Sequence, residues 1–348
     1  MSTKRHILVI RLSAMGDVAM TVPIITAVLK QNPTIKITVL TRAFFKPMFS
    51  QLANTDVFEA DVKGRHKGVL GLWKLYTELK QLGITEVADL HNVLRSTILK
   101  TYFSWGSMPF IQIDKGRKEK KNLTRLASKT LRPLKTTPER YADVFRKLGL
   151  TVNLSKEAVL QREKLSDKVL ELVGNHPNKW IGIAPFAAFS GKMYPLELME
   201  KVLEEVNNTS PHTILLFGGG EIEKKQLEIW ATKFSSCTNM AGVLPFTDEL
   251  ALISNLDVML AMDSGNAHLA ALYGIPTITL WGVTHPYAGF APFGQEVSNC
   301  LLSDIKEYPF IPTSVYGNKF PAGYEKVMHT IAPTDVTQKI FELLVKTE

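Results

Sequence analysis

The stretch that decides the fold spans residues 256–282 and reads LDVMLAMDSGNAHLAALYGIPTITLWG. Residues 258–261 are apolar enough for a strand that is buried on both faces, as in a parallel sheet. Residues 263–266 then interrupt the apolar run with turn and N-cap residues. A short helix at 267–273 and a second strand at 276–280 follow. The stretch therefore predicts a strand–turn–helix–strand unit of an α/β protein.

The turn in this unit is a candidate anion site. In an open α/β sheet, ligands bind at the carboxyl ends of strands, against helix N-termini. The free backbone N–H groups and the helix dipole favour an anion such as phosphate there. Ser264 and Gly265 stand at that position, and His268 falls in the first turn of the helix, where its ring could reach the same anion. We interpret the turn as the holder of the diphosphate of an activated sugar.

Length and composition are those of a two-domain soluble globular protein. The chain has 348 residues, of which 45% are apolar and 21% charged. No uninterrupted apolar segment reaches about 18 residues, so no membrane-spanning helix is predicted. The amino-terminal apolar run is short and ends at Gly16 and Asp17, which favours a first strand over a signal peptide. Cys237 and Cys300 lack metal or redox spacing and favour a reducing compartment.

Charge is unevenly distributed along the chain. Residues 1–160 carry 27 Lys and Arg against 12 Asp and Glu, a net of +15, and the remainder carries 14 against 21, a net of −7. A basic half suits a phosphorylated or acidic partner, an anionic membrane surface or nucleic acid. Its densest part, the basic run 115–135, is predicted as a solvated loop leading into a helix, or alternatively as a segment that captures an anionic acceptor.

Strands and helices are predicted to alternate in both halves, with Pro23 expected to kink the first helix. The first half should contain strands at 7–12, 35–40, 86–90 and 110–113 and helices at 18–31, 69–82 and 141–148. The second half should add strands at 180–184 and 213–217 and helices at 195–206, 221–234, 248–254 and 333–346. Two α/β halves favour a two-domain enzyme with a cleft between them.

Five motifs carry a resemblance to a known family. They are ILVIRLSAMGDVAMTVPII (7–25), DLHNVLRS (89–96), the Lys192 loop before Tyr194-Pro195, FGGGEIE (217–223) and MDSGNAHLAALYGIPTITLWG (262–282). In this order, along nearly the whole chain, they resemble glycosyltransferase family 9, the heptosyltransferases. The resemblance implies a GT-B fold, with two Rossmann-like domains facing a central cleft. It implies an acceptor-binding domain (1–158), a nucleotide-sugar-binding domain (159–332) and a final helix (333–348) that could pack back on the first domain.

The resemblance also implies an activity. Proteins of this kind are inverting, metal-independent transferases without a cofactor, and they move a heptose from ADP-heptose onto the lipopolysaccharide inner core. The expected partners are a phosphorylated lipid A–Kdo-type acceptor and the cytoplasmic face of the inner membrane, not nucleic acid. A GT-B transferase with another nucleotide sugar and another cell-envelope glycan acceptor stays open. A non-catalytic sugar-nucleotide-binding homologue is a further alternative.

Site roles follow from the resemblance residue by residue. Asp17 matches a general base for the acceptor hydroxyl, although a helix N-cap is its simpler structural role. Lys192 matches a cation beside the donor phosphates. The donor loop matches Asp263, Ser264, Gly265 and His268, and Glu221 matches a carboxylate at the nucleoside side. The basic half supplies the expected acceptor-binding residues Arg42, Arg95, Arg117, Lys118, Lys120 and Lys121.

Two of these roles have physical alternatives. A phosphate would repel Asp263, so we expect its carboxylate to bond sugar hydroxyls, backbone amides or Lys192. Glu221 could instead complement the dipole of its helix. A nicotinamide enzyme is disfavoured because no G-x-G-x-x-G follows the first strand, and a nucleic-acid-binding protein because no reader motif is present. No D-x-D pair follows a strand, so Lys192, His268 and the helix N-terminus are the expected stabilisers of the leaving diphosphate.

Overall fold

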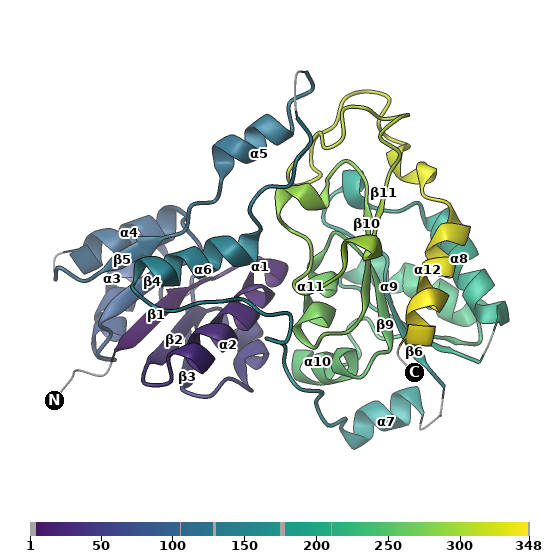
Figure 1. Ribbon diagram of the computed structural model, residues 1–348. Helices are drawn as coiled ribbons and strands as arrows, with labels where there is room; N and C mark the ends of the chain where they lie inside the picture. The colour runs from purple at the N-terminus through teal and green to yellow at the C-terminus, as the bar shows by residue number, and fades with distance from the viewer. Residues whose placement is uncertain (1–4, 105, 128–129, 175–177, 210, 347–348) are drawn as a thin grey trace. The chain divides into compact units, whose positions relative to one another are not determined.

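The computed structural model describes residues 5–104, 106–127, 130–174, 178–209 and 211–346. The chain forms two compact units, and each contains one parallel β-sheet with helices beside it (Figure 1). Unit 1 comprises Met1–Lys115 and Thr137–Leu160, and unit 2 comprises Gly116–Thr136 and Gln161–Glu348. Because the chain crosses between the units more than once, the boundary differs from the single division at 158 that the sequence predicts.

The sheet of unit 1 has the strand order β3-β2-β1-β4-β5, all parallel. Its strands are β1 (His6–Ile10), β2 (Lys36–Thr41), β3 (Thr55–Glu59), β4 (Glu86–Asp89) and β5 (Phe110–Gln112). Every residue of the central strand β1 is buried, as its continuous apolar sequence predicts. Ile10 at its end aligns with Leu40 on one side and Asp89 on the other, so the segments after β1 and β4 begin at the same sheet edge.

The helices of unit 1 are α1 (Met15–Ala19), α2 (Thr21–Gln31), α3 (Gly68–Lys80), α4 (Leu94–Ser104) and α6 (Thr137–Lys147). The predicted kink at Pro23 is wrong in detail, because the single helix expected at 18–31 is divided at Met20. Pro23 consequently lies in the first turn of α2, where a missing N–H costs no intrahelical hydrogen bond.

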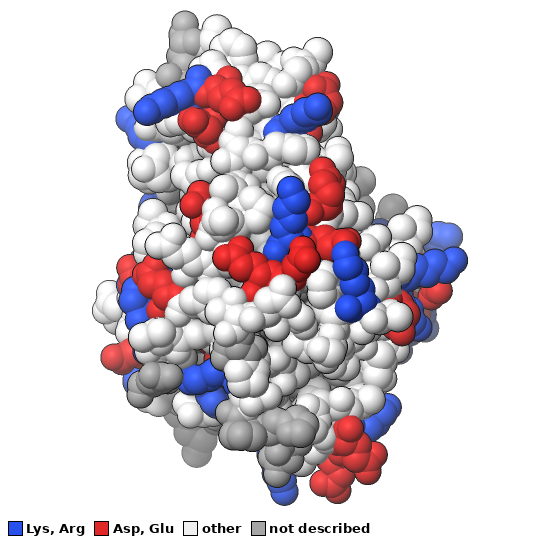
Figure 2. All heavy atoms as spheres, turned by 90° about the vertical axis from the view of Figure 1, so that its right-hand side faces the viewer, with Lys and Arg blue, Asp and Glu red and all other residues white. Residues whose placement is uncertain are grey.

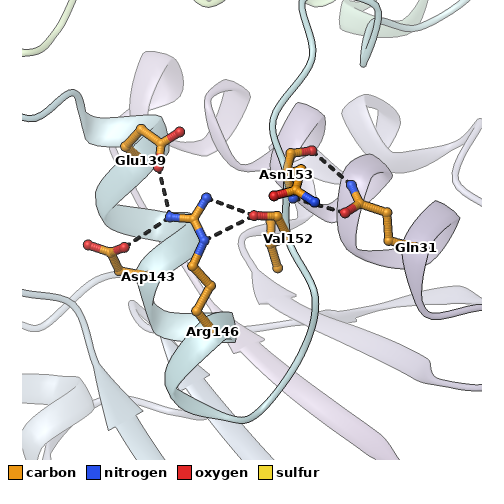
Figure 3. Close-up of polar contacts among 6 residues, drawn as sticks. All are labelled: Gln31, Glu139, Asp143, Arg146, Val152 and Asn153. Atoms are coloured by element: carbon orange, nitrogen blue, oxygen red, sulfur yellow. Dashed lines mark hydrogen bonds and ion pairs between the residues drawn. The ribbon is translucent and has the colours of Figure 1, made fainter.

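The segment after α6 is fixed to unit 1 by side-chain contacts that Figure 3 shows. Arg146 donates to the Val152 carbonyl from both Nε (3.0 Å) and Nη2 (2.7 Å). The amide groups of Gln31 and the backbone of Asn153 exchange two hydrogen bonds of 2.8 and 2.9 Å. The chain therefore stays attached to α2 and α6 until it leaves for unit 2.

The sheet of unit 2 has the order β11-β10-β9-β6-β7-β8, again all parallel. Its strands are β6 (Trp180–Ala184), β7 (Thr213–Leu216), β8 (Cys237–Asn239), β9 (Val258–Met262), β10 (Thr277–Trp281) and β11 (Cys300–Leu302). This is the doubly wound strand order of a Rossmann fold, and unit 1 follows the same order over five strands. The order reverses between β1 and β4 in unit 1 and between β6 and β9 in unit 2. Ligands bind outside the carboxyl ends of strands at such points.

The helices of unit 2 are α5 (Arg117–Leu123), α7 (Asp167–Val173), α8 (Leu196–Thr209), α9 (Glu221–Lys233), α10 (Phe246–Ser254), α11 (Gly265–Leu272) and α12 (Pro333–Lys346). The final helix α12 packs against α8, and its apolar side chains Val336, Ile340 and Leu343 join the core of unit 2. A contact of this helix with the first domain stays a prediction. No helix in the described part of the chain is long and apolar enough to cross a membrane.

The start of the basic run 115–135 differs from its sequence-based prediction. Instead of a solvated loop, helix α5 begins at Arg117, and the whole segment 116–136 belongs to unit 2. The Lys120 ammonium lies 3.9 Å from the ring centroid of Phe290, and the Leu134 N–H donates to the Tyr287 carbonyl. These contacts hold the segment on unit 2. Lys129 lies outside the described residues.

Candidate functional site

In unit 1, Asp17 lies beyond the end of β1 and pairs with Arg11. The Arg11 Nη2 atom is 2.5 Å from Asp17 Oδ2, and the Ala14 N–H donates to the same oxygen over 3.3 Å. Ala14 is the N-cap of α1, so Asp17 is its third helical residue and not the N-cap. The Asp17 side chain keeps 28% of its surface exposed, whereas that of Arg11 keeps 7%. The carboxylate is thus held in place from the protein side and open on the other.

Arg11 and His91 connect the ends of β1 and β4. Arg11 donates from Nη1 to the Leu90 carbonyl over 2.7 Å. Burial and, to a smaller extent, Arg11 and other nearby cations lower the pKa of His91 to about 3, with Asp17 opposing them. The ring is therefore neutral near pH 7, and its Nδ1 is buried without a hydrogen-bond partner among the described residues. A neutral imidazole beside a carboxylate and a guanidinium is a polar group available to a ligand.

Two buried side chains fix the backbone around this cluster. The Tyr141 hydroxyl donates to the Asp17 carbonyl over 3.4 Å, and burial raises the pKa of Tyr141, so it stays protonated. The fully buried Asp89 carboxylate accepts the N–H groups of His91 and Asn92, both at 2.9 Å. The turns after both strands are therefore held by the interior of unit 1.

In unit 2, Lys192 and Asp263 form an ion pair. The Lys192 Nζ is 3.0 Å from Asp263 Oδ2, and the Thr284 hydroxyl donates to the same oxygen over 3.0 Å. Side-chain exposure is 14% for Lys192 and 9% for Asp263. The three residues follow β6, β9 and β10, three adjacent strands whose carboxyl ends share one sheet edge. Lys192 is one of the partners that the sequence predicts for Asp263.

Glycines let the surrounding loops close on Lys192. A Cβ on Gly191 would lie 2.6 Å from both the Gly317 carbonyl oxygen and the Val283 side chain. Gly317 has a φ of +80°, and a Cβ there would overlap the aliphatic stem of Lys192. The Val283 N–H donates to the Gly191 carbonyl over 2.9 Å. This packing determines the direction of the Lys192 side chain.

The N-terminus of α11 lies directly beside this pair in the chain. Ser264 is its N-cap and Gly265 its first residue, but the Ser264 hydroxyl makes no capping bond. That hydroxyl oxygen is buried and lacks a hydrogen-bond partner in the described part of the chain. His268 is 7% exposed on the first turn. The first N–H groups of a helix have no intrahelical acceptors, so the turn offers several donors to an anion.

Glu221 occupies a different strand end. It is the exposed first residue of α9, after β7, as either of its predicted roles requires. The neighbouring Glu223 accepts the Gly219 N–H over 2.7 Å and holds the glycine loop. Glu223 thus fixes the loop, whereas the Glu221 carboxylate is exposed and open to a ligand.

The predicted acceptor-binding residues are divided between the two units. Arg42 donates to the Leu12 carbonyl and lines a hollow of about 550 Å³ in unit 1, together with Phe44, Glu59, Asp61, Lys63 and Arg65. Arg95 is exposed at the start of α4. Arg117, Lys118 and Lys121 are exposed on α5 in unit 2, whereas Lys120 is 8% exposed against Phe290.

Sequence reasoning gave no role to Arg11, His91 or Thr284. Each stands within three residues of the end of a parallel strand, which is a signal that could have found all of them. Among the described residues, no group of three or more His, Cys, Asp or Glu side chains is placed to hold a metal ion.

Comparison with known proteins gives consistent matches. The family model described as "Glycosyltransferase family 9 (heptosyltransferase)" matches residues 72–314. The lipopolysaccharide core heptosyltransferase OpsX of Haemophilus influenzae is 26% identical over 294 residues, covering 81% of this chain and 80% of that protein. The family 9 glycosyltransferase from Veillonella parvula is a similar solved structure, with a TM-score of 0.74, 19% identity and 99% of both chains covered. E. coli heptosyltransferase WaaC with ADP has a TM-score of 0.67 at 17% identity, covering 97% of this chain and 99% of that one.

Fold and matches together define a glycosyltransferase with the GT-B fold of two Rossmann-like domains. The chain belongs to glycosyltransferase family 9, the heptosyltransferase family, whose model matches well over half of it. The predicted fold class, family and enzyme class are confirmed.

Proposed function

We propose that the protein transfers a heptose from ADP-heptose to a phosphorylated lipid A–Kdo-type acceptor, with inversion at the anomeric carbon. The observation that carries the proposal is the Lys192–Asp263 pair beside the N-terminus of α11. The solved relatives support the choice of donor, because WaaC is described with ADP and with ADP-2-deoxy-2-fluoro heptose.

On the donor side, unit 2 supplies positive charge and hydrogen-bond donors. The first N–H groups of α11 and the Ser264 hydroxyl bind the diphosphate, and Gly265 allows it to approach the backbone closely. Lys192 and His268 stabilise the negative charge that grows on the leaving diphosphate. Asp263 orients Lys192 and bonds sugar hydroxyls, and Glu221 binds the ribose.

On the acceptor side, Asp17 acts as the general base. Its exposed carboxylate oxygen takes the proton from the acceptor hydroxyl while that oxygen attacks the anomeric carbon. The transition state carries positive charge on the sugar and negative charge on the departing diphosphate. Arg42, Arg95 and the exposed basic residues of α5 (Arg117, Lys118 and Lys121) attract the acceptor phosphates, with Lys120 supporting α5 from its packed position.

The domain arrangement belongs to the same proposal. The proposed reaction requires the domains 1–158 and 159–332 to bring Asp17 to a donor held by Lys192 across a central cleft. The protein works at the cytoplasmic face of the inner membrane, where it makes peripheral contact with the lipid surface.

A donor panel tests the proposal. Initial rates are measured with ADP-heptose, GDP- and UDP-sugars on a lipid A–Kdo acceptor, and thermal shifts with ADP, GDP, UDP, NAD and an oligonucleotide. We expect turnover with ADP-heptose and the largest shift with ADP. A shift with NAD or the oligonucleotide alone would remove the transferase mechanism. Turnover with another nucleotide sugar would instead favour the alternative, a GT-B transferase that uses a different donor.

A further inference from the structure

Helix α3 of unit 1 carries large apolar side chains on its solvent side. Leu70 is 85% exposed, Val69 60% and Trp73 40%. They lie within one helical turn of each other, and the Trp73 ring packs edge-on against Tyr102 at 5.2 Å between centroids. We call this surface, with the exposed cations Lys67 at the N-cap of α3 and Lys74 on the helix, the docking face.

The exposure does not follow from a poorly packed helix. The opposite side of α3 supplies Leu72, Leu75 and Leu79 to the core of unit 1, and each is at most 2% exposed. The packing of α3 on the core of unit 1 therefore does not depend on Leu70. Single exposed apolar residues are ordinary, but three within one helical turn form an apolar patch of the kind that marks an interaction surface.

Charge determines what kind of partner fits. Residues 61–80 contain five Lys and Arg but only Asp61 and Glu78 as acids, a net of +3. Both acids are engaged within the protein. The Asp61 carboxylate accepts the N–H groups of Gly64 and Arg65, and Glu78 lies 3.3 Å from the Arg65 guanidinium. On the face in Figure 2, by contrast, Lys and Arg are interspersed with Asp and Glu.

We propose that the docking face binds the surface of an anionic phospholipid bilayer. Leu70 and Val69 enter the boundary between headgroups and acyl chains, and Trp73 lies at headgroup level, where its amphipathic ring is favoured. Lys67 and Lys74 attract the lipid phosphates. The inference rests on the proposed function, since an enzyme that glycosylates a membrane lipid must work at the bilayer surface.

The test is co-sedimentation of the full-length protein with vesicles. Vesicles contain phosphatidylcholine with phosphatidylglycerol, or phosphatidylcholine alone. One variant removes the apolar contacts (Leu70→Gln with Trp73→Gln) and another the charges (Lys67→Gln with Lys74→Gln). Matched controls are Val297→Gln, an apolar residue that is 76% exposed in unit 2, and Lys201→Gln on α8. The substituted side chains are solvent-exposed, although Trp73 also packs on Tyr76 and Tyr102, so circular dichroism and the melting temperature are measured to establish that each variant is folded.

We expect the parent to bind the anionic vesicles and each double variant to bind about tenfold more weakly, with the controls unchanged. Transfer to a delipidated acceptor should stay at the parent rate in both double variants. Absence of parent binding, or equal binding by parent and variants, overturns the docking face while leaving the proposed function intact. A parent dimer that the Leu70/Trp73 variant dissociates also overturns it, because a second copy would then be the partner. Lipid binding without any transferase activity would instead contradict the proposed function.

Discussion

Arg11 joins two strand ends to one carboxylate. Its guanidinium lies 2.5 Å from Asp17 and also donates to the carbonyl of Leu90, just beyond β4. Because the guanidinium is planar and rigid, these contacts hold the Asp17 side chain in one orientation at the point where the sheet order reverses. Arg11 is therefore a positioning residue for the proposed general base.

Arg11→Lys tests this positioning. A lysine keeps the charge but cannot span both partners with the same fixed geometry. We expect kcat to fall by about tenfold or more, with little change in the KM for the donor. Steady-state kinetics and a melting curve measure the two effects separately. An unchanged kcat in a folded variant would show that Arg11 serves the fold alone.

Variants of the Lys192–Asp263 pair should show separately how the pair affects stability and how it affects catalysis. Lys192→Met leaves the Asp263 carboxylate buried without its cation, so we expect a loss of about 3 kcal/mol in the free energy of unfolding. The double variant Lys192→Met/Asp263→Asn should recover much of that stability but not the activity. Denaturant unfolding and kcat/KM are measured on all three proteins. Recovery of activity in the double variant would assign the pair a structural role only.

Chelation tests the source of charge stabilisation. If Lys192, His268 and the N-terminus of α11 stabilise the leaving diphosphate, added metal is not needed. We expect the transfer rate to be unchanged after treatment with EDTA. Loss of activity in EDTA with recovery on adding Mg²⁺ or Mn²⁺ would contradict this.

The elements that carry the site could largely be predicted from sequence. The strand 258–261 was predicted because a doubly buried strand has a continuous apolar run, and α12 because its apolar residues recur at helical spacing. Helix α5 was missed because its sequence is dominated by lysine and has no apolar face. It is held instead by contacts such as Lys120 on Phe290, which join residues far apart in the chain.

The same distinction applies to the site. Asp17, Lys192 and Asp263 could be named from local motifs. The contact of Thr284 with Asp263 could not, because Thr284 comes from the neighbouring strand and only its place just after β10 marks it as a candidate.

Glu249 on α10 should make stability depend on pH. Burial raises the pKa of its carboxyl from 4.5 to about 7, so the folded state favours the protonated form. The stabilisation is complete below pH 4.5 and is lost as the pH rises through 7. We expect Glu249→Gln to be more stable than the parent by about 3 kcal/mol at pH 8 and similar to it near pH 4.5. Urea unfolding at both pH values checks this, and an equal difference at the two would refute it.

The most direct test of the account is Asp17→Asn, measured by kcat with ADP-heptose and by calorimetric titration with ADP. Asparagine keeps the shape of the side chain but is not a base. We predict that kcat falls by about a thousandfold while ADP affinity stays unchanged and the variant remains folded. Retained turnover, or loss of folding or of ADP binding together with turnover, would contradict Asp17 as the proton acceptor.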